Sequence, residues 1–168
     1  TNKFFSIDRM TQSAKSINNH LKIALYQPDI PQNTAAIIRL CACFNTRLDI
    51  IQPCGFVMDD KRFKRVCMDY INNCEIKSHK SFQEFINNKK SERIILMTTK
   101  AKAHYHKFKF SNNDTILFGR ESKGVPEKIH QIVDQKLIIP IQKNTRSLNI
   151  VSSVAITLSE ALRQTSNL

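Results

Sequence analysis

Glycine and tryptophan are scarce in this chain, whose 168 residues contain three glycines and no tryptophan. The glycine patterns of two common nucleotide sites are missing. No G-x-G-x-x-G follows an apolar run and no G-x-x-x-x-G-K-[ST] occurs, which argues against a dinucleotide-binding fold and a P-loop. Two of the three glycines, Gly119 and Gly124, nevertheless share one turn. Glycine accepts positive φ and close approach, so this turn is a candidate functional loop.

Cysteine and histidine do not form the pairs that make disulfide frameworks or metal sites. The five cysteines contain no C-x-x-C pair and fall mostly in apolar stripes; they are Cys41, Cys43, Cys54, Cys67 and Cys74. Cys41-x-Cys43 and His104-x-His106 are partial metal motifs that lack a second half at ligand spacing. We therefore expect reduced thiols in a cytoplasmic protein, and no metal.

Acidic residues and long apolar runs are also few. The chain has 14 Asp and Glu against 26 Lys and Arg, a net charge of +12, and its pI is ≈ 9.7. This excess favours nucleic acid as the partner. An acidic membrane surface would attract the same charge, but no apolar run approaches the roughly 20 residues that span a bilayer, and no signal-peptide pattern opens the chain. We expect no membrane association and a single domain.

Short apolar runs alternate with helical patterns. Five runs predict buried parallel strands: Lys22 to Tyr26, Leu48 to Gln52, Arg93 to Thr98, Thr115 to Phe118 and Leu137 to Ile141. Helices are predicted from Asn33 as N-cap, from Asp59 or Asp60, over Ser81 to Asn88 and over Pro126 to Val133. The alternation predicts a single-domain α/β fold with a mainly parallel sheet flanked by helices. Residues 1–20 are expected to form a flexible arm, and residues 21–168 the domain.

The first two helices each show one apolar stripe. The stripes are Ile37, Leu40, Cys41 and Phe44 in the first helix, and Phe63, Val66, Cys67 and Tyr70 in the second. Arg39 falls on the opposite side of the first helix. The expected outer face of the second is basic, with Lys61, Lys64 and Arg65.

The last helix, Leu148 to Arg163, is apolar on two faces. One stripe holds Leu148, Val151, Ala155, Leu158 and Leu162, and the other holds Ile150, Val154 and Ala161. A single sheet cannot cover both faces, so the second predicts a contact with a partner subunit. A central helix of the same chain is the alternative.

The candidate site follows by elimination. Ser122 is not in a nucleophile elbow, because Arg120 stands where G-x-S-x-G needs its first glycine. In an open α/β sheet, ligands bind beyond the carboxyl ends of the strands. These ends lie near Thr98, Gly119 and residues 139–147, and there we expect the site.

Several motifs in order along the chain carry a resemblance to a known family. They are Ile30-Pro31-Gln32-Asn33-Thr34, Ile37-Ile38-Arg39-Leu40, Pro53-Cys54-Gly55-Phe56, Asp59-Asp60-Lys61-Arg62, Leu96-Met97-Thr98-Thr99-Lys100, Phe118-Gly119-Arg120-Glu121-Ser122-Lys123-Gly124, Ile139-Pro140-Ile141 and Arg146-Ser147-Leu148-Asn149. Over about residues 21–164 the chain resembles the SPOUT superfamily of RNA methyltransferases. It is most similar to the small SpoU-type enzymes that methylate the ribose 2'-hydroxyl of the tRNA wobble nucleotide, nucleotide 34.

The resemblance implies a C-terminal trefoil knot and a homodimer packed through the C-terminal helix. It also implies S-adenosylmethionine as methyl donor, with S-adenosylhomocysteine as product, and the anticodon stem-loop of tRNA as partner. Carried over residue by residue, it places the cofactor pocket at Met97, Thr98, Gly119, Ile139, Ser147, Leu148 and Asn149, and we add Ile141 as a further apolar wall. An adenine ring needs flat apolar walls, which Met97, Ile139 and Ile141 can provide.

Asn33 and Arg39 match the family's first motif at the catalytic face. Methyl transfer to a ribose hydroxyl needs orientation more than covalent help, and arginine is a poor base because its pKa exceeds about 12. We therefore expect Arg39 to hold a phosphate or the 2'-oxygen in line. The chain departs from the family at Ala35-Ala36, where Gly-Asn is usual, and at residues 120–123, where Pro-Glu-Thr-Arg is frequent.

Basic segments fit an RNA partner. Lysines in residues 61–65, 77–80, 89–90 and 100–109 can contact phosphates, and aromatic residues in the last segment can stack on bases. Three hypotheses follow. The first is a tRNA wobble ribose methyltransferase, the second the same chemistry on ribosomal RNA or another tRNA position, and the third a knotted RNA-binding protein without turnover.

Overall fold

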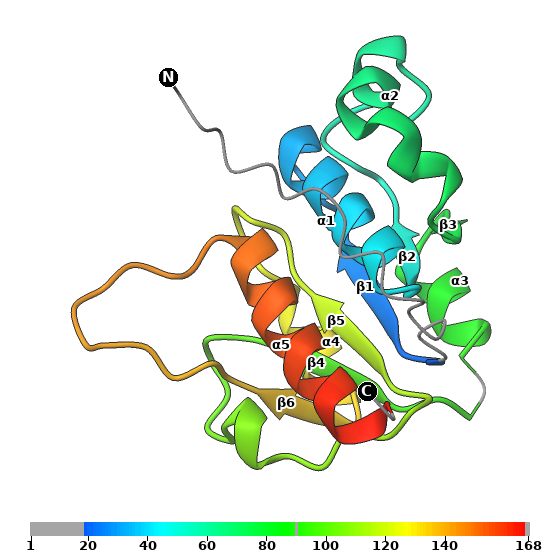
Figure 1. The fold of residues 1–168 in the computed structure, drawn as a ribbon. Coiled ribbons are helices and arrows are strands. Elements are labelled where there is room, and N and C mark those ends of the chain that lie inside the picture. The colour runs from blue at the N-terminus through cyan, green and yellow to red at the C-terminus, as the bar shows by residue number, and fades with distance from the viewer. Residues whose placement is uncertain (1–18, 90, 167–168) are drawn as a thin grey trace, which may run out of the picture.

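The protein is built on one six-stranded parallel sheet (Figure 1). The computed structural model describes residues 19–89 and 91–166. The strands are β1 (Lys22–Tyr26), β2 (Arg47–Ile51), β3 (Ile76–His79), β4 (Ile94–Met97), β5 (Thr115–Phe118) and β6 (Gln135–Leu137), in the order β3-β2-β1-β5-β4-β6. Every pairing in this sheet is parallel, so the carboxyl ends of all six strands lie at the same edge.

Helices cover both faces of the sheet. The α-helices are α1 (Pro31–Cys43), α2 (Lys61–Cys67), α3 (Phe82–Asn87), α4 (Glu127–Ile132) and α5 (Ile150–Thr165), with 3-10 turns η1 (Met68–Asn72) and η2 (Tyr105–Lys107). The larger core cluster joins α1, α2 and α5 to one face, and the smaller joins α3 and α4 to the other. The sandwich confirms the expected α/β fold with a parallel sheet flanked by helices.

The predicted strands agree with the structure except that the edge strand β3 was not predicted and the last strand was misplaced. β1 and β5 have the predicted bounds, and β2 and β4 differ by one residue at each end. β3 was not predicted, because Lys77 and Ser78 are exposed at the sheet edge and leave no apolar run. The prediction of a strand over Leu137 to Ile141 was wrong: the strand ends at Leu137, and Pro140, which has no N–H to donate, stands in the connection that follows.

Asn33 is not the N-cap of the first helix, contrary to expectation. The helix begins at Pro31, its N-cap is Ile30, and no side chain caps it. Proline suits the first helical position because its fixed φ is helical and its missing N–H is not needed there. The earlier start leaves the Asn33 side chain available for contacts outside the helix.

The second helix begins as predicted and ends sooner. Asp60 is its N-cap, and its carboxylate accepts a hydrogen bond of 2.7 Å from the backbone N–H of Arg62. Phe63 is buried, but Val66 is 51% exposed, so the expected stripe was wrong at that position. The helix stops at Cys67 because Met68 takes a φ of 53°, which no α-helix accommodates.

The last helix buries residues from both expected stripes. Its buried residues are Val154, Thr157, Leu158, Ala161 and Leu162, so the face toward the sheet lies between the two. Val151 and Ala155, beside that face, stay half-buried, and Leu148 precedes the helix and is exposed. The prediction that the second stripe meets a partner subunit was therefore wrong at Val154 and Ala161, because the core of this chain buries both. The apolar side chains at the start of α5 stay partly uncovered.

The expected N-terminal arm falls almost wholly outside the described residues, which begin at Asn19. Asn19 itself is buried, and its side-chain amide donates a hydrogen bond of 2.8 Å to the Phe44 carbonyl at the end of α1. The packed part of the chain therefore includes Asn19.

Candidate active site

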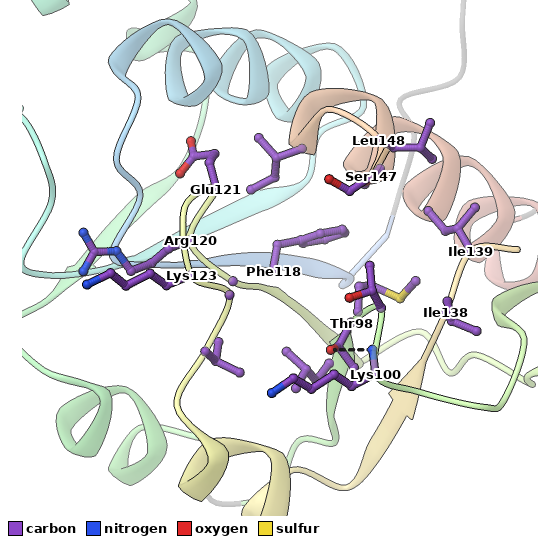
Figure 2. Close-up of a pocket in the computed structure, with 18 of the residues that line it drawn as sticks. Thr98, Lys100, Phe118, Arg120, Glu121, Lys123, Ile138, Ile139, Ser147 and Leu148 are labelled. Carbon is purple, nitrogen blue, oxygen red and sulfur yellow. Dashed lines mark hydrogen bonds between the residues drawn. The ribbon is translucent and has the colours of Figure 1, made fainter. Parts of the chain in front are cut away.

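A cavity of about 600 Å³ opens at the carboxyl ends of β4, β5 and β6, beside the start of α5. Its lining comes mainly from the end of β4, the turn after β5, the connection from β6 into the start of α5, and the start of α1, with one residue from α4. In Figure 2, Glu121, Arg120 and Lys123 lie on one side, and Ser147, Leu148 and Ile139 on the other. The position is the one expected for ligands of an open parallel sheet.

The structure brings the predicted cofactor residues together around this cavity. Met97, Thr98, Gly119, Ile139, Ile141, Ser147, Leu148 and Asn149 all line it. Asn33 lines it too. Arg39 does not, although it stands in the same helix as Asn33.

Different structural constraints require glycine at the two glycine positions of the β5 turn. A Cβ on Gly119 would lie 2.6 Å from the Gly124 Cα, because Arg120 and Gly124 pair as an antiparallel bridge. Gly124 has a φ of 64°, which favours glycine. The glycines therefore close the turn upon itself, and the turn then presents Arg120, Glu121 and Lys123 to the cavity.

A chain of side-chain contacts crosses the cavity mouth. The Asn33 amide donates to Glu121 Oε1 at 3.4 Å, and the Asn149 amide donates to Asn33 Oδ1 at 3.4 Å. Asn149 also caps α5, since its side-chain oxygen accepts from the Val151 N–H at 2.8 Å. Three motifs far apart in sequence thus meet at one polar rim.

Asp29, which the sequence did not single out, joins the first loop to the β5 turn. Its carboxylate accepts hydrogen bonds from the Arg120 guanidinium and from Ser122 Oγ, the latter at 2.6 Å. Its backbone N–H donates to Glu121 Oε2 at 2.9 Å. The hydrogen bonds from Arg120 and then Ser122 lower the pKa of Asp29 to about 2, so this carboxylate is ionised at neutral pH.

The cavity combines apolar walls with a basic side. Phe118, Met97 and Ile139 supply the walls, and the Phe118 ring lies between the two sides in Figure 2. Lys100 and Lys123 add positive charge, and the Lys100 N–H donates to Thr98 Oγ1 at 3.2 Å. Such a pocket suits a ligand with a flat apolar part and polar groups.

Arg39 is held away from the cavity. Its guanidinium lies 4.9 Å from the centre of the Tyr70 ring, on the surface that α1 shares with η1. Six residues of α-helix turn a side chain by about 600°, so Arg39 faces about 120° away from Asn33. A cation over an aromatic ring is stabilised by the ring quadrupole, which orders this exposed arginine.

The expected aromatic stacking surface in residues 100–110 is smaller than predicted. Phe110 is 4% exposed and packs edge-to-face on Phe108, so it cannot stack on a base. The Arg93 guanidinium lies over the Phe108 ring, 5.1 Å from the ring centre. The lysines of this segment are exposed, and Lys102 and Lys107 flank a smaller cavity of about 360 Å³.

Cysteines and metal-binding side chains form no centre in the part of the chain that the structure describes. All five cysteines are free thiols, and no group of three or more His, Cys, Asp or Glu side chains is arranged for a metal ion within residues 19–89 and 91–166. No described helix is long and apolar enough to cross a membrane.

Sequence and structure comparisons agree on the relatives of this chain. Residues 20–159 match the SpoU rRNA Methylase family. A protein of Beijerinckia indica subsp. indica named tRNA (cytidine(34)-2'-O)-methyltransferase is 44% identical over 84% of this chain and 90% of its own length. The counterpart in Escherichia coli strain K12 carries the same name and is 37% identical over 86% of this chain and 93% of its own.

A solved structure described as "Structural insights into the 2-OH methylation of C/U34 on tRNA" is similar throughout. Its TM-score is 0.83, at 33% identity, over 87% of this chain and 96% of that one.

Proposed function

Because the chain belongs to the SpoU methylase family, we propose that it methylates the ribose 2'-hydroxyl of nucleotide 34 in tRNA, with S-adenosylmethionine as the methyl donor. The observation that carries the proposal is the meeting of Asn33, Glu121 and Asn149 at the mouth of one apolar cavity. The matches to relatives named for methylation of cytidine 34 cover nearly the whole length of those relatives, which supports nucleotide 34 of tRNA as the substrate.

The residues of the cavity fit the methyl donor. Its volume of about 600 Å³ lies within the usual range for sites of molecules this size. Met97, Ile139 and Phe118 offer apolar walls for a purine, and Ser147 and Asn149 offer hydrogen bonds to a ribose or an amino-acid group. When bound, the donor supplies an electrophilic methyl group on a sulfonium sulfur.

The chain's own part in the reaction is orientation. Methyl transfer forms a bond from the ribose 2'-oxygen to the methyl carbon and breaks the carbon–sulfur bond, and the 2'-hydroxyl gives up its proton. Asn33, held by Glu121 and Asn149, is placed to hydrogen-bond the ribose at the cavity mouth. Arg39 binds a flanking phosphate or the 2'-oxygen with charge assistance.

We assign Arg39 to the cavity of a partner subunit. The guanidinium lies outside the cavity of its own chain and is ordered by Tyr70 on the protein surface. The apolar surface that could bring a second copy near is close to the cavity: Ile30, Ile141 and Leu148 line it and are 41%, 42% and 38% exposed. Together with half-buried Val151 and Ala155 of α5, these residues support a homodimer through the C-terminal helix.

We further propose that the C-terminal part of the chain is threaded as a trefoil knot, with the site in the cytoplasm where tRNA is found. Two connections frame the cavity from opposite sides, the turn after β5 and the long connection from β6 to α5 (Figures 1 and 2). A knot would hold both at fixed positions around the donor. It is a rare arrangement among folds, and here its support is the family membership.

Two measurements separate this proposal from its alternatives. Calorimetry with S-adenosylhomocysteine reports donor binding, and transfer of labelled methyl from S-adenosylmethionine to tRNA and to ribosomal RNA reports the substrate. Label in tRNA supports the proposal. Label only in ribosomal RNA would move the activity to that substrate, and donor binding without label in either RNA would favour a non-catalytic RNA-binding protein.

A further inference from the structure

A buried histidine lines the cavity on the side of α4. His130 belongs to the last turn of α4 and is 6% exposed, yet it is part of the cavity wall together with Leu96 and Val125. Buried polar side chains usually have hydrogen-bond partners. Among residues 19–89 and 91–166, none hydrogen-bonds to this imidazole, and neither ring nitrogen is fully sealed from solvent.

Burial, aided by two nearby lysines, favours the neutral form of His130. Burial lowers the pKa of His130 most, Glu127 of the same helix raises it, and Lys100 and Lys136 lower it. Lys100 follows β4 and approaches Glu127 to 4.0 Å, while Lys136 lies in β6. The imidazole is therefore uncharged at neutral pH, with one nitrogen able to donate and the other able to accept.

We infer that His130 contacts the methyl donor and tunes its binding: the neutral imidazole hydrogen-bonds the nucleoside part, and the protonated imidazole repels the sulfonium charge. The inference rests on the proposed function, because it takes the cavity to be the donor site. An apolar residue at this wall would serve packing equally well against Leu96 and Val125. A histidine without a protein partner at a ligand cavity has its hydrogen-bonding groups left for the ligand.

Because of this repulsion, the effect of His130 on binding depends on pH and on the charge of the ligand, whereas the effect of a packing contact would not. S-adenosylmethionine carries a positive sulfur and S-adenosylhomocysteine does not. As the pH falls and His130 gains its proton, which its lowered pKa places below the range of an ordinary histidine, the charged imidazole opposes the sulfonium more than the thioether. The affinity ratio of the two ligands therefore reports the charge of His130.

The test is calorimetry of both ligands with the whole protein at pH 7.5 and at a series of lower pH values at which the protein stays folded. His130→Leu removes the hydrogen bond and the charge, His130→Gln keeps a hydrogen bond without titrating, and His106→Leu, at an exposed site outside this cavity, is the matched control. At pH 7.5 we expect S-adenosylhomocysteine to bind about 3- to 10-fold more weakly to His130→Leu, and within about twofold of normal to His130→Gln.

On lowering the pH, the unmodified protein and His106→Leu should lose S-adenosylmethionine affinity at least about threefold more than S-adenosylhomocysteine affinity, while both His130 variants keep a constant ratio. Equal affinities and equal pH profiles for all four proteins would overturn the inference while leaving the donor site intact. No binding of either ligand to the unmodified protein would overturn the proposed function, and the inference with it.

Discussion

The side-chain amide of Asn33 donates a hydrogen bond to Glu121 across 3.4 Å, although the two residues are 88 positions apart in the chain. The bond joins the start of α1 to the turn after β5 at the mouth of the cavity. The Asn149 amide donates to Asn33 Oδ1 at 3.4 Å, so the side chain of Asn33 is held from two sides. Asn33 is the residue proposed to face the ribose.

Loss of this bond should lower turnover and leave donor binding nearly intact. We expect Asn33→Ala and Glu121→Ala each to reduce kcat by at least about tenfold, since a misplaced nucleophile reacts slowly. Because both changes break one contact, the double variant should be little worse than either single one. Single-turnover rates measure the effect. Fully additive losses would show that the two side chains act separately.

Arg39→Ala should abolish methyl transfer without weakening donor binding. Arg39 does not line the cavity of its own chain and is proposed to bind the RNA rather than the donor, so calorimetry with S-adenosylhomocysteine should be unchanged while the rate falls about 100-fold or more. Tyr70→Leu, which removes the ring under the guanidinium, should lower the rate less than Arg39→Ala does. Weakened S-adenosylhomocysteine binding by Arg39→Ala would place the arginine in the donor site instead.

Mixing inactive variants tests whether Arg39 serves a partner. An equal mixture of Arg39→Ala and Asn33→Ala chains, unfolded and refolded together, should regain part of the activity, because a mixed dimer pairs an intact Asn33 cavity with an intact Arg39. Each variant refolded alone is the control. A mixture no more active than its components would put Arg39 and Asn33 in the same chain's site.

The Asp29 carboxylate should stabilise the fold in a pH-dependent way. Its pKa is about 2 in the folded protein, lowered first by Arg120, and an unfolded aspartate titrates near about 3.9. A lowered folded pKa contributes stability above the unfolded value and loses it as the pH falls toward the folded value. The ion pair is partly exposed, so we expect about 1 kcal/mol.

Urea unfolding measures this contribution. Asp29→Asn should lower the free energy of unfolding by about 1 kcal/mol at pH 7 and by clearly less at pH 2.5. Asp59→Asn, at a carboxylate that is 94% exposed, should change little at either pH. A difference for Asp29→Asn that does not shrink on acidification would rule out the ion pair as its cause.

The buried cluster around Asp49 in β2 should contribute more to the free energy of unfolding than the Asp29 ion pair does. Asp49 is fully buried and accepts hydrogen bonds from His79 at 2.9 Å and Lys89 at 2.8 Å. Burial alone would raise the pKa of Asp49, but His79 and Lys89 outweigh it and lower the pKa. Asp49→Ala leaves Lys89 buried without this partner, and we expect a loss of about 3–5 kcal/mol in urea unfolding, against under about 0.5 for Asp59→Ala.

Local patterns in the sequence predicted most elements and few contacts. β1 and β5 could be read residue by residue, because buried parallel strands are continuous apolar runs. β3 could not, because an exposed edge strand has no such run. Pro31 at the first helical position overrode Asn33 as the cap, a case where two local signals competed.

The candidate site needed more than periodicity. Its residues come from several strand ends, helix ends and connections, and which of these meet depends on the order of strands in the sheet. The predicted cofactor residues and Asn33 all line the cavity, whereas Asp29 and His130 were not predicted, because only their neighbours in the folded chain reveal a role for them. A single aspartate after a strand and a single histidine in a short helix carry no pattern of their own.

The most direct test of the central claim is to map the methyl group on RNA. The purified protein is incubated with labelled S-adenosylmethionine and unmethylated tRNA, the tRNA is digested, and the labelled nucleoside is identified and placed in the sequence. We predict one 2'-O-methylated nucleotide, at position 34 of the anticodon loop, and its absence with Arg39→Ala. Label on a base, or at any other position, would contradict the claim.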